Sequence, residues 1–263
     1  MKYLKIDSKG NIITGTTVIL IASLILILIF VLTSMYTLEN ENTDLIANDN
    51  LKYIVNDYNR NLEVLSRDSI AEVTEEVYHG KYIFSSEREI KKVLNKKLDD
   101  KNKEYEKKYG VSISSNVLSI KNTDDPINLE VTTHLKISKN KDRFSGNLKS
   151  ITSVEGLKDP LPYAILTPYS GIWHDDKKIH YGTTLTTYLT AHGIDKPEGY
   201  LGATSPLIIK KCPYDPYIHH GDGDTLQNCL KNGYFHESAD GSCYLCRLEG
   251  KGICPHYGFE VFI

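Results

Sequence analysis

The longest hydrophobic run in this 263-residue chain lies close to its amino terminus. Ile12 to Leu32 form 21 consecutive uncharged, mostly apolar residues. A helix of about 20 residues spans the roughly 30 Å hydrocarbon core of a bilayer. Lysines precede the run and acidic residues follow it, which places the short amino-terminal tail on the cytoplasmic side. The pattern predicts a cytoplasmic tail at 1–10, a transmembrane helix within 11–38, and an extracytoplasmic remainder.

A cleaved secretory signal is the alternative for this segment. Its apolar region spans only about 7–15 residues and ends in a small-residue cleavage site. The residues that follow the run, Thr33 to Tyr36, fit such a site poorly, so a retained anchor in membrane lipid is favoured. Gly15 and the threonines around it permit two such helices to approach closely, which allows a homo-oligomer.

Two amphipathic helices are predicted next. From Thr43 to Tyr78 there is no Gly or Pro, and apolar residues recur at mostly three- and four-residue steps. This stripe comprises Leu51, Ile54, Val55, Tyr58, Leu62, Leu65, Val73 and Val77. A second helix is predicted to begin at Ser86, where Ser86-Glu87-Arg88-Glu89 has the spacing of a capping box, and to end near Gly110.

The hydrophobic period then changes from that of a helix to that of a strand. Between Ile127 and Ile137, apolar residues and Thr133 alternate with polar residues at strict steps of two. Neighbouring strands are predicted at 111–120 and 148–154, separated by polar turns at 122–125 and 138–147. Three strands with one apolar face need a cover, and the two helices supply it.

A pair of prolines, Pro160 and Pro162, interrupts both helix and strand patterns and marks a predicted boundary. The organisation expected outside the membrane is a helix-plus-sheet ectodomain at 39–158 and a Cys/His-rich module at 159–263. The predicted fold class is therefore α+β: a transmembrane helix, long amphipathic helices on a small antiparallel sheet, and a loop-rich carboxy-terminal module stabilised by its cysteines and histidines.

All five cysteines fall within the last 52 residues, in the company of several histidines. The densest part reads Cys243-Tyr-Leu-Cys246 and, after seven residues, Cys254-Pro-His256. A Cys-x-x-Cys turn brings two thiolates to one metal ion, and a second short pair completes a tetrahedron. We therefore predict a structural metal site, with zinc as the cofactor, at Cys243, Cys246, Cys254 and His256. Further candidate ligands are Cys212, Cys229 and His236.

Disulfide bonds are the competing interpretation of the same cysteines. Thiols outside the cytoplasm often oxidise, and a loop-rich module gains stability from cross-links. An odd number of cysteines leaves one thiol free or paired between chains. The sequence keeps the two interpretations open.

Two other groups of residues can bind a divalent cation or act as acid and base. One is the sequence His219-His220-Gly221-Asp222-Gly223-Asp224, and the other is Trp173-His174-Asp175-Asp176 with His180. Asp-Gly pairs are, however, common in ordinary turns. We predict no catalytic residue, because the familiar hydrolase, metalloprotease and nucleotide-binding motifs do not occur in the sequence.

The junction Lys9-Gly10-Asn11 before the apolar run resembles the cleavage site of type IV prepilins, bacterial and archaeal. The resemblance covers about the first 35 residues, and the position where the family usually carries Glu is Gly15. It implies cleavage between Gly10 and Asn11 and packing of the retained helix with its copies in a filament. A plain signal anchor explains the same residues without processing.

Charge narrows the choice of partner. Residues 11–263 contain 28 basic and 33 acidic side chains, a net charge of −5, so nucleic acid is not expected as a partner. The sequence favours a single-pass protein with a structural or adhesive role at the cell surface, pilin-like in one version. A membrane-anchored, metal-dependent extracytoplasmic enzyme is the alternative, with an open site among His219, His220, Asp222 and Asp224.

Overall fold

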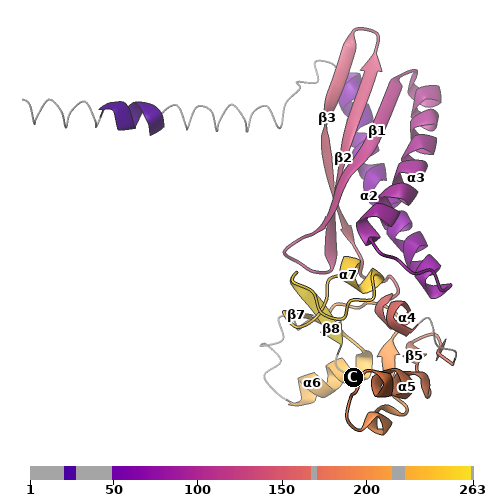
Figure 1. Ribbon diagram of the computed structural model, residues 1–263. Helices are drawn as coiled ribbons and strands as arrows, with labels where there is room; N and C mark the ends of the chain where they lie inside the picture. The colour runs from indigo at the N-terminus through magenta and orange to yellow at the C-terminus, as the bar shows by residue number, and fades with distance from the viewer. Residues whose placement is uncertain (1–20, 28–48, 167–170, 215–222, 262–263) are drawn as a thin grey trace, which may run out of the picture. The chain divides into compact units, whose positions relative to one another are not determined.

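The computed structural model describes residues 21–27, 49–166, 171–214 and 223–261 (Figure 1). Residues 21–27 are helical, and Asn48–Ile263 form one compact unit. Among the described residues, no helix combines the length and the apolar composition needed to cross a membrane. The rest of the predicted membrane segment lies outside the described residues, as do Gly10 and Asn11.

The two predicted amphipathic helices are present. Helix α2 spans Asp49–Tyr78 and helix α3 spans Ser86–Tyr109. Every residue of the predicted α2 stripe is buried, except that Leu65 is half-buried. Helix α3 ends where expected, at Gly110, whose φ of 63° is left-handed and therefore suits glycine.

The predicted capping box at the start of α3 is wrong. Ser85 occupies the cap position, and its side chain makes no capping hydrogen bond. Ser86 is the first helical residue, and its backbone N–H and its hydroxyl both donate to Glu249 Oε1, each at 2.8 Å. The carboxylate of Glu249, from a distant part of the chain, thus accepts the Ser86 N–H for which the capping box predicted a local acceptor.

Three antiparallel strands form the main sheet in the order β1-β2-β3. They span Ser112–Asn122, Asn128–Lys139 and Asp142–Ser153. The alternation predicted from Ile127 to Ile137 is confirmed, since all six of its inward residues are buried. Helices α2 and α3 lie side by side against this sheet, with α3 along β1 and α2 along β3 (Figure 1).

The predicted polar turn at 138–147 is mostly strand. Strands β2 and β3 stay paired as far as Lys139 and Asp142, so Asn140 and Lys141 alone make the turn. Asn140 adopts a φ of 56°, a left-handed conformation that asparagine tolerates. Phe144 is the one large apolar residue between 138 and 147, so the ladder extends beyond the region in which alternation is visible.

Short elements make up the remainder of the compact unit. They are α4 (Leu161–Leu166), β4 (Trp173–His174), β5 (Lys178–His180), α5 (Thr184–Ala191), the 3-10 turn η1 (Pro197–Tyr200), β6 (Thr204–Pro206), α6 (Gly223–Asn232), β7 (Phe235–Ser238), α7 (Tyr244–Leu248) and β8 (Gly258–Val261). Strands β4, β5 and β6 form a second antiparallel sheet in that order, and β7 pairs with β8. Ile179, Tyr181 and Leu207 form a small core beneath the second sheet. The α+β class is confirmed.

Candidate metal centre

The Cys-x-x-Cys segment folds into a single helical turn. Cys243 precedes α7 with extended backbone angles, and its carbonyl accepts the N–H of Arg247 at 2.9 Å. This turn places Cys243 and Cys246 on the same side, three residues apart. Gly250, with a φ of 74°, then reverses the chain so that the loop carrying Cys254 and His256 returns to the helix.

Two glycines allow this loop to pass close to the backbone that precedes α7. A side chain at Gly258 would place its Cβ 2.5 Å from the carbonyl carbon of Ser242. A side chain at Gly241 would meet the carbonyl oxygen of Phe259 at the same distance. Neither position has room for any larger residue, so the two glycines set the approach of β8 to Cys243.

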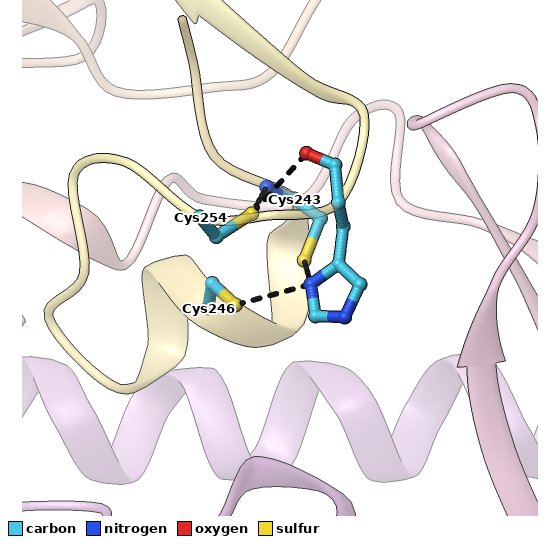
Figure 2. Close-up of side chains that lie close together, drawn as sticks. Cys243, Cys246 and Cys254 are labelled. Carbon is cyan, nitrogen blue, oxygen red and sulfur yellow. Dashed lines mark hydrogen bonds between the residues drawn. The ribbon is translucent and has the colours of Figure 1, made fainter. Parts of the chain in front are cut away.

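The four predicted ligands converge. One ligand atom each from Cys243, Cys246, Cys254 and His256 lies within 4.8 Å of all the others. Both Cys243 Sγ and Cys246 Sγ lie 3.6 Å from His256 Nδ1. Figure 2 shows the sulfur atoms of the three labelled cysteines pointing toward a common centre. Cys243, Cys246 and Cys254 form no disulfide bond in the structure.

These distances match those required by a tetrahedral metal ion. With metal–sulfur bonds of about 2.3 Å and metal–nitrogen bonds of about 2.0 Å, neighbouring ligand atoms lie roughly 3.5–3.8 Å apart. The three cysteines are buried and His256 is exposed, so the site has its sulfur ligands in the protein and its imidazole at the surface. The cluster can therefore hold a metal ion with four protein ligands.

Electrostatic interactions favour the ionised, thiolate form of Cys243. A hydrogen bond from Cys246, reinforced by the Cys246 backbone N–H, lowers the pKa of Cys243 to about 5 despite the opposing effect of burial. The same bond retains the proton on Cys246 and raises the pKa of Cys246. Because a metal ion would displace such a shared proton, metal binding to this cluster would release protons and would weaken at low pH.

The further candidate ligands form a second cluster. Ligand atoms of Cys212, Cys229 and His236 all lie within 4.8 Å of one another, and all three residues are buried. The two sulfur atoms are 3.4 Å apart. These residues come from the loop before α6, from α6 and from β7. The described part of the chain therefore contains one four-ligand and one three-ligand cluster that can bind metal.

Sequence reasoning missed a buried ion pair beside the first cluster. Arg247, the residue after Cys246, donates from Nε and Nη2 to the two carboxylate oxygens of Asp159, at 2.8 and 2.5 Å. Their side chains are only 6% and 0% exposed. Phe259 and Phe235 flank the guanidinium group, whose centre lies 4.9 and 5.6 Å from their rings.

Helix α7 is also bonded to both long helices. The Tyr244 hydroxyl lies 2.7 Å from Thr74 Oγ1 in α2, in a fully buried contact. Glu249, just after α7, accepts the two hydrogen bonds from Ser86 at the start of α3. A metal ion on Cys243 and Cys246 would thus fix the helical turn that joins α2, α3 and Asp159.

The remaining predicted groups are only partly assembled. His180 Nε2 lies 3.0 Å from Asp175 Oδ2, and the His180 ring stacks on Trp173. His219, His220 and Asp222 lie outside the described residues, so the arrangement of that group is not described; Asp224 lies in the first turn of α6.

Comparisons of this chain with protein-family models, with curated proteins and with solved structures found no match.

Proposed function

We propose that this chain is a single-pass membrane protein with a cytoplasmic amino terminus and a structural or adhesive role at the cell surface. The observation that supports a structural role is the four-ligand cluster, because Cys243, Cys246, Cys254 and His256 would complete the tetrahedral coordination of one metal ion and would leave no position for a substrate. The apolar run from Ile12 to Leu32 supports the anchor and its orientation.

Zinc is the proposed occupant of this cluster. Three thiolates and one imidazole are a set that zinc takes in closed structural sites, and zinc brings no redox chemistry to the thiols. Its role would be to hold α7 against the two long helices through Tyr244 and Glu249. The site would act as a cross-link in the fold.

A pilin-like subunit is the more specific form of this proposal. Support comes from the Lys9-Gly10-Asn11 junction and from the succession of a long helix and an antiparallel sheet. Architecture alone is a weak guide to function. The test of the pilin-like form is therefore whether the chain is cleaved after Gly10. Intact mass of the protein from its native membrane tests it: loss of residues 1–10 supports the pilin-like form, and an intact Lys9-Gly10 tail contradicts it.

Two measurements test the general proposal. Membrane fractionation with protease added to intact cells is expected to find the chain in the membrane and residues after about 38 accessible from outside. Elemental analysis after gel filtration is expected to find zinc that survives dialysis and is lost in the Cys243→Ser/Cys246→Ser variant. A freely soluble chain in the first measurement contradicts the anchor, and a zinc-free native protein contradicts the centre.

The second cluster favours one alternative function. Cys212, Cys229 and His236 supply three ligands, the number that catalytic zinc sites use when a fourth position is left open for water or substrate. A membrane-anchored, metal-dependent enzyme would use this cluster. A second metal ion per chain that exchanges readily with cobalt supports the enzyme, whereas a single, slowly exchanging zinc supports the structural role.

A further inference from the structure

The second sheet presents one face that is turned away from the core. Ile179 in β5 and its partner Ser205 in β6 are buried, so their side chains face inward. Because side chains alternate along a strand, Lys178 and His180 point to the opposite face. Cross-strand pairing puts Trp173 beside His180 on that same face.

Trp173 forms a flat aromatic surface there. Its ring is parallel to that of His180, with an interplanar angle of 3° and a centroid separation of 3.8 Å. Trp173 is nevertheless 55% exposed. Hydrogen bonds fix this arrangement, because Asp175 accepts from the backbone N–H groups of Lys177 and Lys178, at 2.8 Å each, and contacts His180.

The ionised form of Asp175 is strongly favoured. Its hydrogen bond with His180, together with the two backbone N–H groups, lowers the pKa of Asp175 to about 2. The carboxylate is therefore ionised at physiological pH, and it contacts the His180 ring that stacks on Trp173. An exposed tryptophan that is supported in this way is preorganised for a flat partner, because little side-chain freedom remains to be lost on binding.

A basic cavity of about 620 Å³ opens on the same face. Two of its lining residues adjoin His180. Lys178 lies two residues before His180 on β5, and Thr204 on β6 pairs with His180. Its other lysines are Lys177, Lys210 and Lys231. Asp176 is the one acidic residue among the lining residues that the structure describes. The lining also includes the apolar residues Ile208 and Leu230.

The four lysines of this cavity form no ion pair with any described residue, whereas Lys211 nearby is paired with both Asp125 and Glu237. The chain as a whole is negatively charged, at −3. The described lining residues therefore carry a net positive charge, four lysines against Asp176, on a chain whose overall charge is negative. Charges in a cleft attract an oppositely charged ligand more strongly than charges on a flat surface.

We infer that this face binds an acidic oligosaccharide, with a sugar ring stacked on Trp173 and its carboxylates held by the lysines of the cavity. The face of an aromatic ring carries partial negative charge and therefore attracts the C–H groups of a pyranose ring. Ammonium groups bind carboxylates without fixed geometry, which suits a flexible sugar chain. This inference deepens the adhesive role proposed above and rests on it for its biological meaning.

Trp173 is the single tryptophan of the chain, so its fluorescence reports binding directly. The full chain in detergent micelles, loaded with zinc, is titrated with a trimer of galacturonic acid and separately with the same trimer as its methyl ester. The acidic trimer is expected to change the fluorescence in a saturable way that weakens with added salt, and the neutral ester to have little effect.

Variants locate the site by calorimetry with the acidic trimer. Trp173→Ala and the double variant Lys178→Gln/Lys210→Gln are each expected to weaken binding about tenfold or more. The matched controls are Phe84→Ala, another exposed aromatic residue, and Lys141→Gln in the turn of the main sheet, and both are expected to bind like the unmodified chain.

Several outcomes would overturn the inference: no binding of the acidic trimer, equal binding of the ester, equal losses in the control variants, or an equal response to inorganic phosphate or to single-stranded DNA. A chain that holds zinc, fractionates with membranes and fails to bind the trimer contradicts this inference alone. A chain that binds the trimer and lacks zinc or membrane association contradicts the function proposed above and leaves the sugar site standing.

Discussion

Individual side chains of the metal centre have unequal roles. Cys243, Cys246 and Cys254 are buried, whereas His256 lies at the surface and reaches the cluster through Nδ1. A surface ligand can be exchanged for another ligand type without repacking the interior. The histidine is therefore the position at which metal binding can be separated from folding.

We expect His256→Ala to lower zinc affinity by roughly two orders of magnitude, which is about a quarter of the binding free energy of a typical four-ligand zinc site. His256→Cys is expected to retain zinc, because a fourth thiolate also satisfies tetrahedral coordination. Competition with a zinc-specific chelating dye measures both affinities. Equal affinity of the alanine variant and the unmodified chain would mean that His256 is not a ligand.

The buried pair of Asp159 and Arg247 gives a second prediction at this scale. Removing one partner leaves an uncompensated charge in the interior, so Arg247→Met is expected to destabilise the fold by about 3–5 kcal/mol. Replacing both, as Asp159→Leu/Arg247→Met, is expected to restore a substantial part of that loss. Urea unfolding of the two single variants and the double variant measures the coupling; strictly additive losses would show that the pair does not interact.

The sequence predicted the four residues of the Cys/His cluster and not this ion pair. Cys-x-x-Cys and Cys-x-His are local patterns, and the spacing within each pair reflects the geometry of a metal ion directly. Asp159 and Arg247 are 88 positions apart, and each alone is typical of an exposed residue. No pattern along the chain connects them, because their pairing depends on how α7 packs against the segment before α4.

A helix or strand could be predicted from the sequence where its own residues carry a clear hydrophobic pattern. It could not be predicted where its bounds depend on residues in other parts of the chain. Helices α2 and α3 and strand β2 each carry an apolar face with a clear period, and each was predicted close to its observed bounds. The start of α3 depends instead on Glu249, which is 163 residues away, and the extension of β3 carries a single large apolar residue, Phe144, which makes no alternating pattern. Contacts with residues outside each element therefore determine where α3 begins and how far β3 extends.

The return of β8 to Cys243 provides a prediction for an element. Gly258→Ala is expected to destabilise the protein by about 1–3 kcal/mol or more, because its Cβ would collide with the backbone of Ser242. Gly252→Ala, in the same loop, has no atom within 4 Å of the added Cβ and is the matched control. Thermal unfolding compares the two, and equal melting temperatures would contradict the close approach.

At the scale of the compact unit, the helical turn that carries Cys243 and Cys246 contacts parts that are remote in sequence, through Tyr244 and Glu249. Removing zinc with a chelator is expected to loosen α7 and the start of α3, while the three-stranded sheet, held by its own ladder and by α2, stays protected. Hydrogen exchange read out by mass spectrometry measures this. Uniform loss of protection over Asn48–Ile263 would show instead that the metal supports the entire compact unit.

The bonds of α7 to the long helices have a consequence for how the chain reaches its final state. Tyr244 meets Thr74 across 170 positions, and Glu249 meets Ser86 across 163. Contacts of such separation form slowly, because a long loop must close before they contribute. During synthesis, which proceeds from the amino terminus, α2 and α3 are made long before Tyr244 and Glu249. The surfaces of the two helices that these residues contact therefore stay exposed for that interval. A chaperone that binds the newly made chain would be most useful during that interval.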